Sequence, residues 1–176
     1  MHSNTPTPPE HDDTDSPTVL VAQARSLAPA LVSSIDKVAR SRLQTVGAQA
    51  TLVEVAAKLS NAQISLVVVC DEAGQAIGAI TETLLIRRLG LGNADFFTTQ
   101  ARDVMTHDIT RCTPEDGLSD LLAMMHQSGL IHVLVVDSDN QPIGVVNARD
   151  GLRALLAAGN REEELLRNYV MGIGYQ

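Results

Sequence analysis

Apolar residues follow two different spacings along the chain, and these spacings alternate in a fixed order. Spacings of three and four residues over 51–62 and 117–128 predict amphipathic helices. Nearly continuous apolar runs, "ISLVVVCD" and "LIHVLVVD", predict strands buried on both faces. After each run come a polar turn ("EAGQ" or "SDNQ"), a second short apolar run ("AIGAI" or "PIGVV") and another helical segment. The pattern therefore predicts mixed α/β structure.

The whole pattern occurs twice, at a constant offset of 66 residues. This offset aligns Asp71 with Asp137 and Gly78 with Gly144, and it continues through both copies without a gap. A self-similar chain of this kind indicates two copies of one supersecondary unit.

Each copy is predicted to have the order β-α-β-β-α, because a short apolar segment (43–46 or 109–112) precedes its first helix. The copies cover residues 36–101 and 102–167. A sheet this small leaves one apolar face uncovered when it stands alone. We therefore expect the two units to pack sheet against sheet with pseudo-twofold symmetry.

The flanking segments differ from the repeats. Residues 1–18 are rich in Pro, Thr and Asp, which predicts a disordered tail. Residues 19–35 show the spacing of a helix interrupted near Pro29, and 168–176 form a C-terminal tail. The N-terminus lacks the features of a secretory signal, and no apolar run approaches the roughly 20 residues of a membrane span. A cytoplasmic protein is therefore expected.

Composition narrows the function. A net charge of −8 over 176 residues argues against general binding of nucleic acid or anionic membranes. The two cysteines and five histidines are scattered, so no metal site is expected. We find no nucleophile–base pair and no phosphate loop, so we do not expect an enzyme.

Asn147 and Asp150 stand three residues apart where the last helix is predicted to begin. One explanation is capping, in which Asn147 accepts a hydrogen bond from the first turn and Asp150 reaches back to form a capping box. The other is a ligand site, since free amides and a carboxylate at a helix start can hold polar groups. The two roles are compatible.

The doubled unit, the segments "LVVVCDEAGQAIGAIT" and "VLVVDSDNQPIGVVN", and the polar-x-x-Asp corner resemble a tandem pair of CBS domains, or Bateman module, of a small stand-alone bacterial type. This resemblance implies a regulatory module that binds an adenosine-containing nucleotide between its units and signals by a conformational change. AMP is expected first, as in energy sensing, followed by ATP or ADP, NAD(H) and S-adenosylmethionine. A flat homodimer and an unidentified regulated protein are the implied partners.

The resemblance also implies a main cleft around Asp150, whose carboxylate would accept both ribose hydroxyls. Asn147 and Arg149 would face the phosphate, although relatives carry Ser or Thr at the Asn147 position, which puts that contact in doubt. The other implied contacts in this cleft are Gln44, Thr45, Val46, Ile64, Ser65, Leu66 and Val145.

In the first unit, Leu84 occupies the position equivalent to Asp150, and a leucine cannot hold a diol. We therefore expect one good site per chain and a weaker second cleft. The implied contacts in the second cleft are Thr81, Thr83, Thr110, Arg111, Cys112, Ile131 and His132. The competing hypothesis is a ligand-free module for protein–protein interaction or dimerisation.

Overall fold

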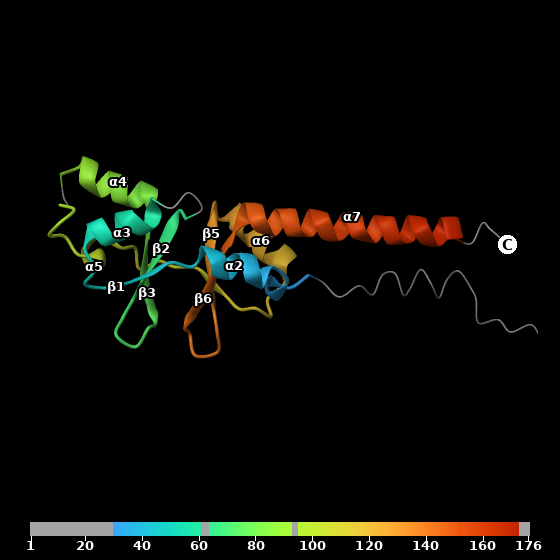
Figure 1. Ribbon diagram of the computed structural model, residues 1–176, viewed down its shortest axis with the longest axis horizontal. Helices are drawn as coiled ribbons and strands as arrows, with labels where there is room; N and C mark the ends of the chain where they lie inside the picture. The colour runs from blue at the N-terminus through green and yellow to red at the C-terminus, as the bar shows by residue number, and fades with distance from the viewer. Residues whose placement is uncertain (1–29, 61–63, 93–94, 173–176) are drawn as a thin grey trace, which may run out of the picture.

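A computed structural model describes residues 30–60, 64–92 and 95–172 of the chain (Figure 1). The predicted disordered tail and residues 19–29 of the predicted helix over 19–35 lie outside these residues, and of the remainder residues 32–35 form a 3₁₀ helix. Among the described residues, no helix combines the length and the apolar character needed to cross a bilayer.

The first unit contains β1 (Thr45–Gly47), α3 (Leu52–Leu59), β2 (Leu66–Cys70), β3 (Ala76–Thr81) and α4 (Glu82–Gly90). Its sheet has the order β1-β2-β3, in which β1 runs parallel to β2 and β2 antiparallel to β3. All five residues of β2 are buried, as the continuous apolar run predicts.

The second unit repeats this topology with β4 (Arg111–Cys112), α6 (Leu118–Gln127), β5 (His132–Val136), β6 (Pro142–Asn147) and α7 (Ala148–Gly172). Even the irregularities match, because each antiparallel pair shifts register at the same place, between Val69 and Cys70 and between Val135 and Val136. The mixed α/β fold of two β-α-β-β-α units is therefore confirmed.

The two sheets pack against each other. One apolar cluster draws on both units and joins Val68 and Ala79 to Leu134 and Val145, all of them at most 3% exposed. The two hairpins also exchange hydrogen bonds: the Gln75 side chain donates to a carbonyl of the opposite turn, and Gln141 Nε2 donates to the Ala73 carbonyl oxygen at 3.2 Å.

Each unit packs against a short helical segment that the repeat boundaries in the sequence assign to the other unit or to the flanking chain. The 3₁₀ helix η2 (Val32–Ile35) and α2 (Asp36–Arg42) come before the strands of the first unit, yet they pack on the second unit, where α2 lies against β6 (Figure 1). In return, α5 (Ala101–Val104) joins the core of the first unit. Each unit is thus completed by a segment that lies outside its own compact repeat.

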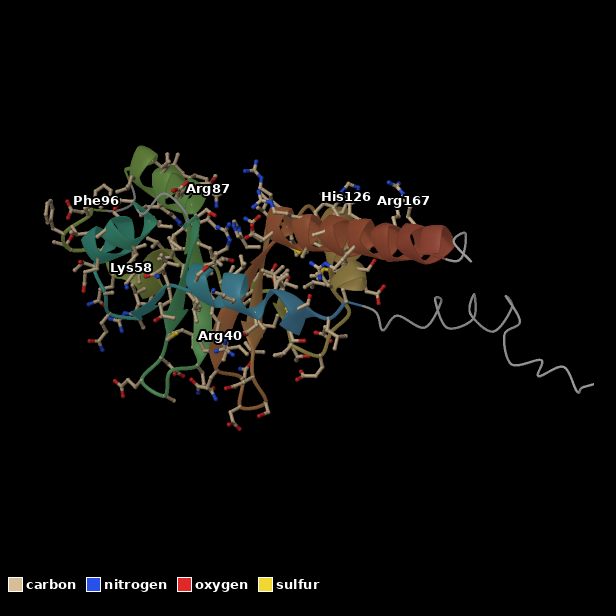
Figure 2. All side chains as sticks on the ribbon, turned by 45° about the vertical axis from the view of Figure 1, so that its right-hand side comes forward. Arg40, Lys58, Arg87, Phe96, His126 and Arg167 are labelled. Carbon is tan, nitrogen blue, oxygen red and sulfur yellow. The ribbon has the colours of Figure 1, made fainter. Side chains whose placement is uncertain are left out.

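The last helix is longer than predicted. Helix α7 spans 25 residues and continues past residue 167, where the second repeat was expected to end. Its C-terminal half extends beyond the sheets, and Arg167 projects from this part (Figure 2).

Glycine allows α2 to approach the second sheet closely. A Cβ built on Gly144 of β6 would lie 3.0 Å from the Ala39 Cβ and 3.1 Å from the Ala39 carbonyl carbon. Both residues are buried, and one of the two obstructing atoms belongs to the backbone, so α2 itself would have to move.

Replacing Gly144 by alanine is therefore expected to lower the free energy of unfolding by about 1–3 kcal/mol, because α2 is pushed away from β6. Equilibrium urea unfolding measures this change. The matched control is Gly159→Ala, since Gly159 is exposed in α7 with open space around it. That change should raise stability by up to about 1 kcal/mol through helix propensity. Equal stability of the Gly144 variant and the wild type would contradict the close approach.

Candidate functional site

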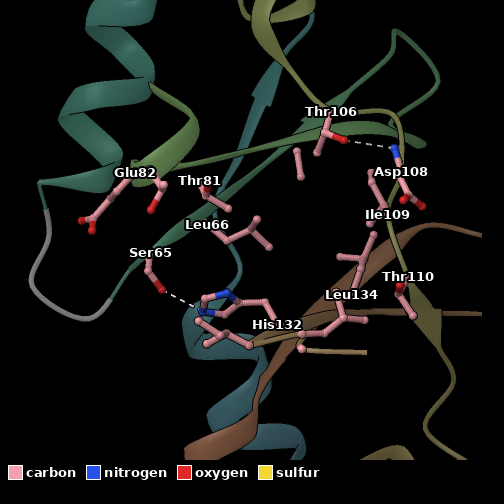
Figure 3. Close-up of a pocket in the computed structure, with 15 residues that line it drawn as sticks. Ser65, Leu66, Thr81, Glu82, Thr106, Asp108, Ile109, Thr110, His132 and Leu134 are labelled. Carbon is pink, nitrogen blue, oxygen red and sulfur yellow. Dashed lines mark hydrogen bonds between the residues drawn. The ribbon is translucent and has the colours of Figure 1, made fainter. Parts of the chain in front are cut away.

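A cleft of about 560 Å³ opens between the two units (Figure 3). We call it the open cleft. The first unit contributes Ser65, Leu66, Ala79, Thr81, Glu82 and Thr83. From the second half of the chain come Thr106, residues 108–110, residues 129–132 and Leu134. Its volume lies within the range of about 300–1,000 Å³ that small-molecule sites occupy.

Apolar and polar groups are separated within this cleft. Leu66, Ala79 and Leu134 belong to the cluster between the sheets, so they form an apolar floor. Threonine hydroxyls and the exposed carboxylates of Glu82 and Asp108 stand above it. Such a floor suits a planar apolar group, whereas the polar groups suit hydroxyls.

The polar corner of the open cleft is the start of α4. The Thr81 hydroxyl oxygen accepts a hydrogen bond from the Leu84 amide at 3.1 Å, so this residue caps the helix. Leu84, at the position equivalent to Asp150, does not line the cleft.

His132 stands on the wall that the open cleft shares with its twin. The Asn147 side-chain amide donates to His132 Nε2 at 3.1 Å, and the Ser65 hydroxyl lies 2.7 Å from the same nitrogen. Because Asn147 can only donate from that amide, Nε2 acts as the acceptor and the ring is neutral. Burial, followed by the positive charge of Arg42, also lowers the pKa of His132.

The twin cleft around Asp150 is closed. The Asp150 carboxylate forms an ion pair with the guanidinium Nε of Arg42 in α2. The Asp150 side chain is only 9% exposed and the Arg42 side chain 19%. The cavity beside this pair has a volume of about 10 Å³ and is lined by Arg42, Ile64, Ser65, Leu66, His132 and Val145. That is room for about one water molecule, and a nucleotide base does not fit in this state. We call this region the Asp150 cleft.

Capping at this corner is only partly as expected. Asn147 caps α7, since its Oδ1 accepts a hydrogen bond from the Arg149 amide at 2.9 Å. The expected capping box was wrong, because Asp150 turns toward Arg42 instead of back to Asn147. An ion pair shielded from solvent holds the carboxylate more strongly than one further amide would.

The structure brings together some of the residues predicted for each cleft and separates others. Ile64, Ser65, Leu66 and Val145 line the Asp150 cleft, and Thr81, Thr83, Thr110, Ile131 and His132 line the open cleft. Their roles in binding stay predictions. Asn147 and Asp150 do not line either cavity themselves, but they contact His132 and Arg42, which line the Asp150 cleft. Six other predicted residues line neither cavity: Gln44, Thr45, Val46, Arg149, Arg111 and Cys112.

Strand geometry and competing partners explain these absences. Alternate residues of a strand face opposite sides, so Val46 and Cys112 point into the cores of their own units. Burial, together with Asp116, raises the pKa of Cys112 to about 12, which keeps its thiol neutral. Arg111 donates to the Ala76 carbonyl oxygen at 2.9 Å, and the Gln44 amide oxygen accepts from Lys58 at 3.4 Å. The remaining two, Thr45 and Arg149, are exposed.

Three charged residues that the sequence analysis missed now define the clefts: Arg42, Glu82 and Asp108. Arg42 and Asp108 are themselves equivalent under the 66-residue offset. The repeat alignment already pairs them, and considering the residues two places before Gln44 and Thr110 as contacts would have found both. Among the described residues, no group of three His, Cys, Asp or Glu side chains could hold a metal ion.

Two equivalent units, packed sheet against sheet with a cleft at their seam, define a paired α/β module. The CBS domain family model matches residues 32–91 and 101–157, and the chain belongs to this family. The chain is 25% identical over 126 residues to an uncharacterized 17.7 kDa protein of Acidianus ambivalens, an alignment that covers 72% of this chain and 75% of that protein.

Solved structures share the fold. The CBS domain pair of protein MJ0100, in complex with 5′-methylthioadenosine and S-adenosyl-L-methionine, is 19% identical and superposes with a TM-score of 0.62. The match covers 74% of this chain and 98% of that one. CBSX2 in complex with AMP is 18% identical with a TM-score of 0.62, and the match covers 73% and 98% of the two chains.

The neutral state of His132 predicts a pH dependence of stability. The folded state holds this pKa below the unfolded value of about 6.5, so the unfolded chain binds more protons as the pH falls through that value. The contribution of His132 to stability is therefore complete above pH 6.5 and is lost progressively below it. Urea unfolding at several pH values between 7.5 and 5.5 measures the slope. In His132→Gln the slope over this range should be smaller, and an unchanged slope would contradict the prediction.

Proposed function

We propose that this chain is a non-enzymatic regulatory module that binds an adenosine-containing ligand in the cleft between its CBS units. The observation that supports this most strongly is the open cleft, about 560 Å³ in volume, with its apolar floor and polar corner. Two structural neighbours are complexes with adenosine compounds, namely 5′-methylthioadenosine with S-adenosylmethionine, and AMP. We extend that ligand class to this chain.

The lining of the open cleft suits the two parts of a nucleoside. A planar base would lie on the aliphatic floor beside Leu66 and Leu134. The sugar hydroxyls would meet the corner, where the Glu82 and Asp108 carboxylates can accept hydrogen bonds. Charge-assisted hydrogen bonds of this kind contribute about 1.5–3 kcal/mol each.

Signalling would follow from the position of this cleft. Both units line it, so a ligand that fits one relative arrangement of the units better than another shifts the equilibrium between them. A regulated protein would read the altered surface. AMP was the first ligand expected from the sequence, and the proposal covers the adenosine compounds as a class.

The Asp150 cleft is the second candidate location for this ligand. Binding a ribose there requires Arg42 to release Asp150, which leaves two charges to be satisfied again. Breaking a fully buried ion pair costs about 3–5 kcal/mol, and less where a side chain reaches solvent, as Arg42 does. A nucleotide could offset this cost, since its hydroxyls replace the guanidinium at Asp150 and its phosphate accepts from Arg42.

A module for protein–protein interaction is the competing function, and exposed apolar side chains favour it. Ile131, Leu152 and Leu156 are 64%, 55% and 61% exposed, and the first two line a surface groove with α6 residues. Clustered apolar side chains on a surface are typical of interaction sites. The expected homodimer could use this face, and it stays a proposal together with the cytoplasmic location.

Calorimetric titration separates the two functions. We expect at least one of adenosine, 5′-methylthioadenosine, S-adenosylmethionine, AMP, ATP and NAD to bind with a Kd of the order of 1 µM, or about −8 kcal/mol. Inosine, in which a carbonyl replaces the adenine amino group, is the control for recognition of the base. No heat with any of these ligands would contradict the proposed function and favour the interaction module.

A matched pair of substitutions assigns the ligand to a cleft. Thr83 and Arg149 occupy equivalent positions in the first turns of α4 and α7, and both are exposed, so tryptophan at either should not disturb a core. Thr83→Trp fills the open cleft and is expected to weaken binding by at least about tenfold, or 1.4 kcal/mol. Arg149→Trp is the matched control and should leave binding unchanged, because Arg149 lines neither cavity. An equal loss in both variants would contradict the assignment of the ligand to the open cleft.

A further inference from the structure

We infer that the open cleft selects adenosine compounds that carry no phosphate, either a neutral nucleoside or one with a cationic sulfonium, over phosphorylated nucleotides. This inference rests on the proposed function, because it names the ligand class for the same cleft. It differs from the expectation drawn from the family resemblance, in which AMP comes first.

The charges that face the open cleft are negative. Fifteen residues line it, and among them Glu82 and Asp108 carry carboxylates while none is lysine or arginine. Both side chains are exposed. Figure 3 shows Glu82 and Asp108 on opposite sides of the cleft. A phosphate bound between them would face like charges in a partly desolvated space.

Among the described residues that line the open cleft, no cation compensates these charges. His132 accepts a hydrogen bond at Nε2 from the Asn147 side-chain amide, and the Ser65 hydroxyl lies 2.7 Å from the same nitrogen, so the ring is neutral where it borders the cleft. Arg42 lines the adjoining Asp150 cleft, where its guanidinium is paired with Asp150.

Comparison of the two repeats strengthens the inference. At equivalent positions the open cleft has Asp108 where the Asp150 cleft has Arg42, and Thr83 where the other corner has Arg149. Glu82 replaces Ala148 in the same way. The residues around the open cleft are therefore acidic or neutral at positions where the equivalent residues around the Asp150 cleft are basic or neutral, although the two units share one backbone fold.

The start of α4 points to the same ligand class. The free amides of a helix start favour an anion, but here Glu82 already places a carboxylate in the first turn, and Thr81 takes up the Leu84 amide. The same carboxylates accept hydrogen bonds from the hydroxyls of a nucleoside and attract a sulfonium. The corner thus favours hydroxyl donors and cations over phosphate.

Titration of the wild-type chain with adenosine, 5′-methylthioadenosine, S-adenosylmethionine, AMP and ATP tests this inference. The comparison uses only the binding that Thr83→Trp abolishes, which restricts it to the open cleft. We expect the three compounds without phosphate to bind at least about tenfold more tightly than AMP, and ATP to bind more weakly still. The difference should shrink at high salt, because exposed charges are screened.

The double variant Glu82→Gln/Asp108→Asn should cancel most of this preference by improving AMP binding relative to adenosine by about tenfold. The matched control is Glu72→Gln/Glu115→Gln, which removes the same charge from exposed positions outside the cleft and should leave the preference unchanged. AMP binding as tight as adenosine binding, or binding that Thr83→Trp leaves intact, overturns the inference while the proposed function stands. Absence of binding by every compound overturns the proposed function itself.

Discussion

The apolar contact between the two sheets is the interaction on which the rest of the structure depends. Each unit has only three strands, so its inner face stays exposed unless the other unit covers it. The shared cluster supplies that cover with residues such as Val68 and Leu134, which are at most 1% exposed. The open cleft and the Asp150 cleft lie where this packing ends, at the corners between the last strand and the last helix of each unit. The same contact thus stabilises the pair and provides the floor of the site.

The equivalent corners of the two units differ, because one is closed and the other is open. At one, Arg42 of α2 reaches the carboxylate of Asp150 and closes the space to about 10 Å³. At the other, the equivalent positions are Asp108 and Leu84, which form no such pair, and the cleft stays open. A single ion pair therefore accounts for much of the asymmetry. This asymmetry lets one backbone offer two chemically different pockets, of which the open one is the acidic one.

The sequence predicted most of the fold but only part of the arrangement of the clefts. The apolar runs located β2 and β5 because a strand buried on both faces must be apolar throughout. For the site, sequence reasoning pointed to the two corners at the starts of α4 and α7, and it ranked the clefts by whether Asp150 or Leu84 was present. That ranking assumed that Asp150 faces open space. Arg42, which fills this space, lies 108 residues away in sequence, and no local pattern connects the two.

The sequence by itself determined the repeat, the order of elements in each unit and the packing of sheet on sheet, because periodicity and burial are local properties of the chain. Only the tertiary structure decided which helix completes which unit, that α2 lies on β6 across Gly144, and that Arg42 pairs with Asp150. These outcomes depend on distances between segments far apart in the chain. Such distances are set by the close packing of the whole core, and the spacing of residues along the chain does not contain them.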